Sequence, residues 1–358
     1  MIFLERLDVW GKNKQEYRDL FLFNPYFIAE IGVNHEGSIQ KAKELIRSAA
    51  DNGANAVKFQ SYKAERLTSI DSPAYWDIES ESTPSQFELF KKYDNLDFED
   101  YFELKDYSDE CGVEFLTTPF DEIFVEELDD ILDFYKVASA DITNYPLLKK
   151  IASKNKPLIL STGASSKEEI NSALDFLDQY NIEVLLNHCI LSYPTQIENA
   201  NLGMIEDLIL SYPENIIGYS DHTPPQNDFY VQILSSLLGA TFIEKHFTLD
   251  KDIAGNDHYH SFDGDDLREF RLKLSSLKDI YGKNKKEVIP IEEPARKNAR
   301  RSLVFAIGMK KGEIITKDSL VPKRPGTGVS PKELETLIGR KLNQDVEGDS
   351  HLKLDMLD

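Results

Sequence analysis

Cysteine, long apolar segments and positive charge are all scarce in this sequence of 358 residues. Its two cysteines, Cys111 and Cys189, are too few for a disulfide framework or a cysteine-rich metal cluster, and they favour a reducing compartment. No apolar run approaches the length that crosses a membrane, and the first residues lack the apolar core of a secretion signal. We therefore expect a cytoplasmic protein.

Basic residues number 41 against 63 acidic ones, which gives a formal net charge of −22. A surface this acidic repels nucleic acid and anionic membranes, so we expect neither as a partner. An anionic substrate would need a local group of lysine or arginine side chains inside a cleft. Because 41% of the residues are hydrophobic, the chain can build one large domain or two unequal ones.

From residue 26 onward, short β-rich runs alternate with longer amphipathic segments. This alternation predicts an α/β fold with parallel strands and crossover helices. Eight such units in about 250 residues favour a (β/α)8 TIM barrel. A doubly wound open sheet is the alternative, but polar residues end nearly every run instead of gathering at one switch point. The eight runs begin at Phe27, Ala56, Val113, Phe134, Pro157, Glu183, Ile216 and Thr241.

The helical patterns between these runs include residues 38–51, 97–110, 166–179 and 227–238. Each begins at a residue that commonly caps a helix N-terminus. The predicted caps are Ser38, Asp97, Ser166 and Asn227.

We predict four parts along the chain. Residues 1–25 form a cap under the barrel, residues 26–282 the catalytic barrel, residues 283–297 a charged linker with two prolines, and residues 298–358 a small β-rich domain. A long segment follows the second strand, where insertions overhang the active face of a barrel. Its Tyr75 and Trp76 either line a substrate pocket or pin the loop to the barrel.

The C-terminal ends of the predicted strands carry residues suited to an anion site, and in a barrel these ends open on the active face. Side chains alternate faces along a strand, so Lys58 and Gln60 share one face. A lysine near the open end can neutralise a phosphate or carboxylate; salt bridges to Glu30 or Asp141 are the alternative. The predicted anion site consists of Lys58, Lys136, Thr118, Ser139 and Ser161.

His222 and His246 end the last two predicted strands and are the candidate metal ligands. Neutral imidazole suits manganese, iron, cobalt, nickel and zinc, whereas magnesium prefers oxygen. His258 and His260, in the loop after the last strand, are a competing pair that we rank lower because a loop is less preorganised. For His188, and for His35 in the first loop, we expect hydrogen-bonding roles in the structure.

Several motifs together resemble the sialic acid synthases, which include N-acetylneuraminate synthases and their legionaminate and pseudaminate relatives. The resemblance runs from about residue 26 to the end, and the tail is similar to the antifreeze-like SAF domain. The motifs are Ile28-Ala-Glu-Ile-Gly-Val-Asn-His-Glu-Gly, Val57-Lys-Phe-Gln, Leu116-Thr-Thr-Pro-Phe, Tyr135-Lys-Val-Ala-Ser, Leu160-Ser-Thr-Gly, Tyr219-Ser-Asp-His-Thr, Glu244-Lys-His-Phe-Thr and Lys323-Arg-Pro-Gly-Thr-Gly.

This resemblance implies condensation of phosphoenolpyruvate with an open-chain N-acetylmannosamine-type sugar, with release of phosphate by C–O cleavage. N-acetylneuraminate synthase is the leading expectation, and a legionaminate or pseudaminate synthase is the alternative. The resemblance also implies a divalent metal, manganese first with magnesium or cobalt as alternatives, and a domain-swapped homodimer. The implied roles are His222 and His246 for metal; Glu30 as a base or electrostatic stabiliser; Lys58, Thr118, Lys136, Ser139 and Ser161 for phosphoenolpyruvate; and Gln60, Tyr193, Asp257 and, from the partner subunit, Arg324 for sugar.

Some positions depart from the family pattern around the expected sugar pocket. Leu191 replaces an asparagine, for which Ser192 compensates only in part, and Asp141 replaces a glutamate. Gly255-Asn-Asp-His-Tyr-His also differs from the common Gly-Pro-Asp-His.

Three rival functions stay open from the sequence. They are a Schiff-base aldolase that uses Lys136 or Lys58, a metal-dependent sugar isomerase or phosphohydrolase, and an ice-binding or carbohydrate-binding tail beside an inactive barrel.

Overall fold

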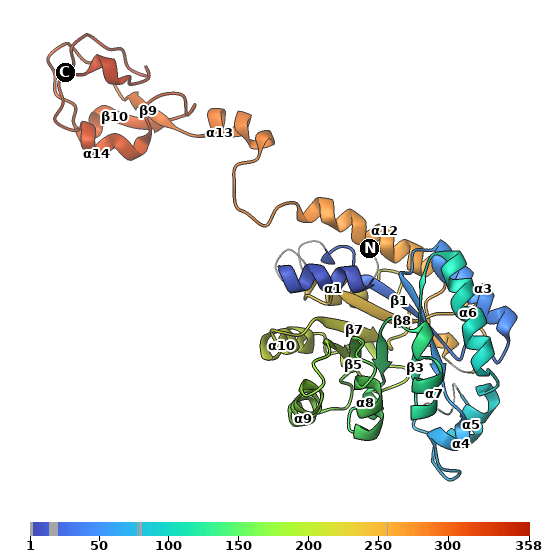
Figure 1. Cartoon of the computed structure of the whole chain (residues 1–358). Coiled ribbons are helices and arrows are strands. Elements are labelled where there is room, and N and C mark those ends of the chain that lie inside the picture. The colour runs from blue at the N-terminus through green and yellow to red at the C-terminus, as the bar shows by residue number, and fades with distance from the viewer. Residues whose placement is uncertain (1–2, 14–20, 77, 79–80, 256) are drawn as a thin grey trace. The chain divides into compact units, whose positions relative to one another are not determined.

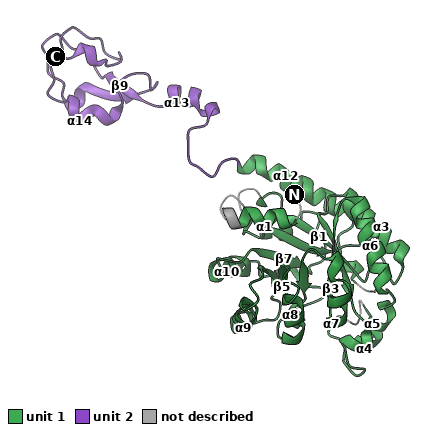
Figure 2. Cartoon of the chain, viewed as in Figure 1, with its two compact units in different colours: residues 1–281 green, residues 282–358 purple. Residues whose placement is uncertain are grey.

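The computed structural model describes residues 3–13, 21–76, 78, 81–255 and 257–358. The chain divides into two compact units, residues 1–281 and residues 282–358 (Figure 2). Each unit has its own hydrophobic core and is described by itself. None of the helices among the described residues combines the length and hydrophobicity that a membrane crossing requires.

The first unit is built on eight parallel strands in the order β3-β2-β1-β8-β7-β6-β5-β4 (Figure 1). Strands β3 and β4, at the two ends of this order, lie next to each other, so the sheet is a nearly closed barrel. The predicted α/β barrel is therefore confirmed. The strands are Tyr26–Gly32 (β1), Ala56–Ser61 (β2), Glu114–Pro119 (β3), Tyr135–Val137 (β4), Leu158–Ser161 (β5), Val184–Cys189 (β6), Ile217–Asp221 (β7) and Phe242–His246 (β8).

Helices surround the barrel, and most of them bury apolar side chains in its core. The helices of this unit are Phe3–Lys12 (α1), Ile39–Asp51 (α3), Ala64–Leu67 (α4), Gln86–Tyr93 (α5), Phe98–Cys111 (α6), Glu122–Glu127 (α7), Tyr145–Ala152 (α8), Lys167–Asp178 (α9), Gly203–Ser211 (α10), Tyr230–Leu237 (α11) and Gly264–Tyr281 (α12).

Three of the four predicted N-caps are confirmed. Ser38 and Ser166 cap α3 and α9 with their hydroxyls, and Asp97 precedes α6 in a capping box. The prediction for Asn227 is wrong, because α11 begins at Tyr230 after Phe229, whose φ of 57° lies in the left-handed region. The chain turns sharply there, and the helix starts later than the residue pattern suggests.

Helix α1 lies at the N-terminal end of the barrel, opposite α4 and α5 (Figure 1). Phe3 stacks on Phe134 with ring centroids 4.0 Å apart, and its backbone N–H donates to Glu114 at 2.9 Å. Trp10 and Phe21 join the same buried cluster. The described part of the predicted cap therefore closes the barrel floor as a helix, while residues 1–2 and 14–20 of that prediction lie outside the described residues.

The second unit has a small core of its own around Leu303, Phe305, Ile315, Leu342 and Leu352. Its two longest strands pair antiparallel. Part of the predicted linker is helical, because α13 begins at residue 293. The elements are Glu293–Ala299 (α13), Ser302–Phe305 (β9), Leu320–Lys323 (β10) and Leu334–Leu337 (α14).

Candidate active site

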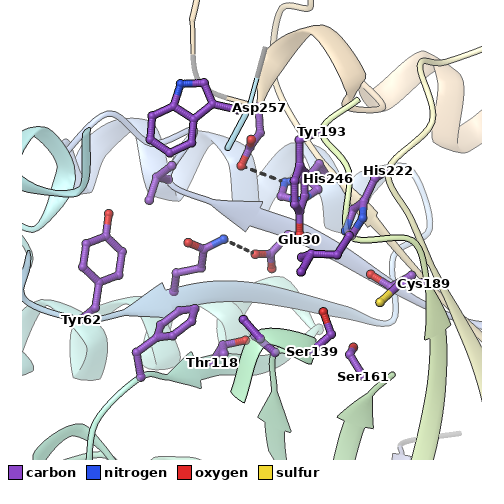
Figure 3. Close-up of a pocket in the computed structure, with 18 of the residues that line it drawn as sticks. Glu30, Tyr62, Thr118, Ser139, Ser161, Cys189, Tyr193, His222, His246 and Asp257 are labelled. Atoms are coloured by element: carbon purple, nitrogen blue, oxygen red, sulfur yellow. Dashed lines mark hydrogen bonds and ion pairs between the residues drawn. The ribbon is translucent and has the colours of Figure 1, made fainter. Parts of the chain in front are cut away.

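A cavity of about 520 Å³ opens at the C-terminal ends of the barrel strands (Figure 3). It is lined by side chains from widely separated segments, because parallel strands deliver their last residues to one rim. The structure brings together every predicted site residue of the first unit. These are Glu30, Lys58, Gln60, Thr118, Lys136, Ser139, Ser161, Tyr193, His222, His246 and Asp257.

Two lysines and two glutamates form a buried charge network in this cavity. Lys58 Nζ lies 2.6 Å from Glu30 and 3.9 Å from Glu244, and Lys136 Nζ lies 3.0 Å from Glu244. Both lysines are therefore ion-paired and also line the cavity. For Lys58 the predicted salt bridge to Glu30 is present, and its role in an anion site stays a prediction. Glu244 is the partner of Lys136, whereas Asp141 accepts a hydrogen bond from Asn144.

Burial shapes the protonation of this network. It raises the pKa of Glu30; Lys58 opposes this change and Glu244 adds to it. Burial also acts against the charged form of Glu244, but Lys136 and Lys58 overcome it and lower the pKa of Glu244 to about 2. Glu244 is thus firmly ionised, and Glu30 is the easier of the two carboxylates to protonate.

Hydroxyl groups complete the predicted anion site. Thr118 accepts a hydrogen bond from Lys58 Nζ at 3.1 Å, and Ser139 lines the same wall. The buried Ser161 hydroxyl has no hydrogen-bond partner among the described residues. Since buried polar atoms are normally paired, this donor is available to a ligand.

His222 and His246 face the cavity from the ends of β7 and β8 (Figure 3). Their ring centroids lie 5.7 Å apart. The Nδ1 of His222 donates to the Ile190 carbonyl oxygen at 2.8 Å, which leaves Nε2 as its free nitrogen. Burial lowers the pKa of His222 to about 4 and that of His246 well below its usual value, so both rings are neutral near pH 7. Neutral imidazoles are what a divalent metal requires, so these residues fit the metal that the family implies.

The other four histidines of the first unit have different surroundings. His188 contacts the Ala200 carbonyl at 3.0 Å, and His35 accepts from the Gly37 N–H at 3.0 Å, which confirms the structural roles predicted for both. His258 contacts the Thr248 hydroxyl through Nδ1 at 2.8 Å. His260 lies beside His246, with ring centroids 4.7 Å apart.

Three of the predicted sugar-binding residues line the cavity. Gln60 donates to Glu30 at 3.1 Å, Asp257 lies 3.3 Å from His246, and the Tyr193 ring lies 4.3 Å from the His222 ring. Tyr75 and Trp76 also line the cavity, which supports their role as a pocket wall.

Two departures from the family pattern also face the cavity, Leu191 and Asp141. Ser192 is exposed and donates to the Pro194 carbonyl at 3.2 Å, so it does not replace the missing amide. Residue 256 of the altered Gly255 motif lies outside the described residues. Arg324 is exposed in the second unit, and its role stays a prediction.

Sequence reasoning missed three contributors to the site. Glu244, two residues before His246 on β8, was given no role, although it forms an ion pair with Lys136 and accepts a hydrogen bond from Ser220 at 3.0 Å. Cys189 lines the cavity, and burial raises the pKa of its thiol. His260 was ranked low because it lies in a loop.

Comparison with known proteins agrees with this geometry. The family model described as "NeuB family" matches residues 45–286, and that of the SAF domain matches residues 300–358. The chain belongs to the NeuB family. Homologues are named as synthases of sialic, legionaminic and pseudaminic acids, so this is a family of sialic acid-type synthases.

Similar members of the NeuB family come from distant organisms. The N,N'-diacetyllegionaminic acid synthase of Legionella pneumophila is 34% identical over 91% of this chain and 93% of its own. The human N-acetylneuraminate-9-phosphate synthase is 30% identical over 93% of this chain and 92% of its own. The crystal structure of the N-acetylneuraminic acid synthetase of Leptospira borgpetersenii is 32% identical, with a TM-score of 0.67 over 76% of this chain and 90% of that one.

Proposed function

We propose that this chain condenses phosphoenolpyruvate with an open-chain N-acyl amino sugar and releases phosphate, giving a 2-keto-3-deoxy sugar acid. The observation that carries the proposal is one cavity that holds two buried lysines, an unpaired serine hydroxyl and two neutral histidines. Membership of the NeuB family supports it.

The charge network suits an anionic substrate. The two lysines and two glutamates have a formal sum of zero, so the cavity is not strongly positive before substrate enters. The phosphate and carboxylate of phosphoenolpyruvate would take over Lys58 and Lys136, with Thr118, Ser139 and Ser161 donating further hydrogen bonds. Glu30 would then lose its ion-pair partner and, because it is buried, become the group that holds or accepts a proton near the sugar aldehyde.

We propose His222 and His246 as the ligands of a divalent cation, with manganese first and magnesium or cobalt as alternatives. When bound, such a cation polarises a carbonyl oxygen and orients water. The two imidazoles come from neighbouring strands, and their neutral state supports this assignment.

The lining of the cavity supports a choice of acceptor. It includes the apolar side chains of Leu67, Leu89, Phe90 and Leu191 beside polar ones. These apolar groups suit the methyl and acetamido groups of a 2,4-diacetamido-2,4,6-trideoxyhexose better than the terminal hydroxyl of N-acetylmannosamine. The relatives named N,N'-diacetyllegionaminic acid synthase, at 34% and 36% identity, support this acceptor as the preferred one.

We further propose that the protein works in the cytoplasm as a homodimer in which each second unit serves the other subunit's cavity. Arg324, exposed in the second unit, would contact the sugar's acyl group there. The separate core of this unit supports its folding as a module on an exposed connection.

A phosphate-release assay tests the proposal. With phosphoenolpyruvate and manganese, we expect phosphate release only when a sugar acceptor is added, faster with the diacetamido sugar than with N-acetylmannosamine. His222→Ala and His246→Ala should each abolish it. Wild-type rates in either variant contradict the metal role. Sugar-independent release favours a phosphohydrolase, and inactivation by borohydride with a keto acid favours a Schiff-base aldolase.

A further inference from the structure

Arg324 lies on a short loop that begins where β10 ends. Its side chain is exposed, and its guanidinium has no hydrogen bond or ion pair within the described part of the chain. A long exposed side chain on a loop is normally free to point in many directions. The backbone of this loop, residues 324–328, is nevertheless held by three hydrogen bonds from other segments of the second unit. We call these residues the arginine loop.

Two of the three hydrogen bonds are made by one side chain, that of Ser302. Ser302 is the first residue of β9 and is completely buried. Its hydroxyl donates to the Pro325 carbonyl oxygen at 2.7 Å and accepts from the Gly328 N–H at 2.7 Å. A serine hydroxyl has one donor and two acceptor lone pairs, so a single side chain holds both ends of the loop. Because Pro325 directly follows Arg324, the first bond acts on the backbone that sets where the arginine points.

The third hydrogen bond and two close approaches hold the middle of the loop. The Gly326 N–H donates to the Lys297 carbonyl oxygen, in α13, at 2.8 Å. A Cβ atom at Gly326 would lie 2.6 Å from the Cβ of Arg300, and one at Gly328 would lie 3.1 Å from the Cβ of Ser302. Neither glycine therefore leaves room for a side chain. Packing this close restricts the movement of the loop.

We propose that Ser302 is a positioning residue, whose hydroxyl fixes the arginine loop so that Arg324 presents its guanidinium to the acceptor sugar in one direction. The inference rests on the proposed function for what Arg324 binds, whereas the contacts of Ser302 belong to the second unit by itself. A binding group that is held in place beforehand loses less freedom when its ligand arrives, and this favours binding. Ser302 does not touch the sugar and acts through the loop backbone.

Steady-state kinetics of the full-length protein test this role, with phosphoenolpyruvate and the acceptor sugar varied in turn. Ser302→Ala removes both hydroxyl contacts. Gly326→Ala is a second variant, which displaces the loop from α13 and leaves Ser302 unchanged. Ser319→Ala is the matched control. Ser319 is another buried serine of this unit; its hydroxyl accepts from the Thr316 N–H at 3.0 Å, at the opposite end of β10 from the arginine loop.

We expect both loop variants to raise the KM for the sugar at least about threefold, and by less than Arg324→Ala, because the guanidinium is misplaced but still present. The KM for phosphoenolpyruvate should not change. In an Arg324→Ala background, Ser302→Ala should have no further effect on the KM for the sugar, since no guanidinium is left to position. Ser319→Ala should lower the thermal stability and leave both KM values unchanged.

Hydrogen exchange measures the loop without any substrate. Mass spectrometry of a peptide that contains Gly326 and Gly328 should show faster exchange in Ser302→Ala than in the wild type, because the Gly328 N–H loses its acceptor. Ser319→Ala should exchange at the wild-type rate in this peptide. Thermal unfolding checks that each variant folds.

Three outcomes overturn the proposal: unchanged exchange in Ser302→Ala, faster exchange with an unchanged KM for the sugar, or an equal effect of Ser302→Ala with and without Arg324. A wild-type KM for the sugar in Arg324→Ala would refute the sugar contact of Arg324 and, with it, the positioning role. Absence of sugar-dependent phosphate release from the wild type would refute the proposed function itself, whereas a failure of the loop variants in an active enzyme refutes the positioning role alone.

Discussion

The ion pair between Asp221 and Lys245 lies directly behind the candidate metal ligands. Each residue immediately precedes one of the histidines, and the two face each other across β7 and β8. Their side chains are 0% exposed, with Lys245 Nζ 2.8 Å from Asp221 Oδ2. We predict that this ion pair holds the last residues of both strands in place, and that breaking it lowers the free energy of unfolding.

The loss of stability should differ between the two residues, because Asp221 and Lys245 have different numbers of other hydrogen-bond partners. Asp221 also accepts from Tyr219 at 3.0 Å, from the N–H and hydroxyl of Thr223 at 2.8 Å each, and from Gln232. Lys245 has one other hydrogen-bond acceptor among the described residues, the Thr223 carbonyl. Asp221→Asn therefore leaves a buried ammonium poorly compensated and should cost about 3–5 kcal/mol. Lys245→Met leaves a carboxylate with four donors and should cost less.

Urea unfolding followed by circular dichroism measures these losses. We expect the double variant to lose less stability than the sum of the single losses, with a coupling of about 1–3 kcal/mol. Lys167→Met is the control, because its pair with Asp207 at 2.7 Å has similar geometry but is about half exposed, and no measurable change is expected. Additive single losses below about 1 kcal/mol would refute the reasoning.

Three further predictions concern the cavity and its surroundings. Lys136→Met should raise the KM for phosphoenolpyruvate about tenfold to a hundredfold, the cost of a charged hydrogen bond, with little change in the KM for sugar; equal effects on both would contradict the anion site. Arg324→Ala should raise the KM for the sugar by a similar factor and leave the KM for phosphoenolpyruvate unchanged, as steady-state kinetics would show. Full activity after deletion of residues 290–358 would exclude a role of the second unit at the other subunit's cavity. Burial lowers the pKa of His35 from 6.5 to about 4. As the pH falls, this histidine is therefore protonated in the unfolded chain before it is protonated in the folded chain, and the free energy of unfolding decreases between these two pH values. Relative to His35→Asn, the wild type should therefore lose about 3 kcal/mol more between pH 7 and pH 4, and parallel stability curves would contradict this.

The sequence was sufficient for features set by local periodicity. The β/α rhythm predicted each barrel strand, and the two-residue period placed Lys58 and Gln60 on one face of their strand, which is the cavity side. Capping residues predicted three helix starts, but not that of α11, where the positive φ of Phe229 delays the helix.

Contacts across the barrel were beyond sequence reasoning. Lys136 and Glu244 are 108 residues apart and meet only because the sheet closes. The loop residue His260 reaches His246 for a similar reason, since the chain after β8 folds back over the rim and Phe262 N–H donates to the His246 carbonyl at 2.8 Å. Strand-end patterns could not predict that His260, and not His258, lies beside His246.

The fate of the bridging oxygen of phosphoenolpyruvate tests the central claim most directly. With oxygen-18 between C2 and phosphorus, manganese and the diacetamido sugar, we predict that the released phosphate carries the label, because the C–O bond breaks. Label retained in the sugar acid, or no phosphate release that depends on the sugar, would contradict the account.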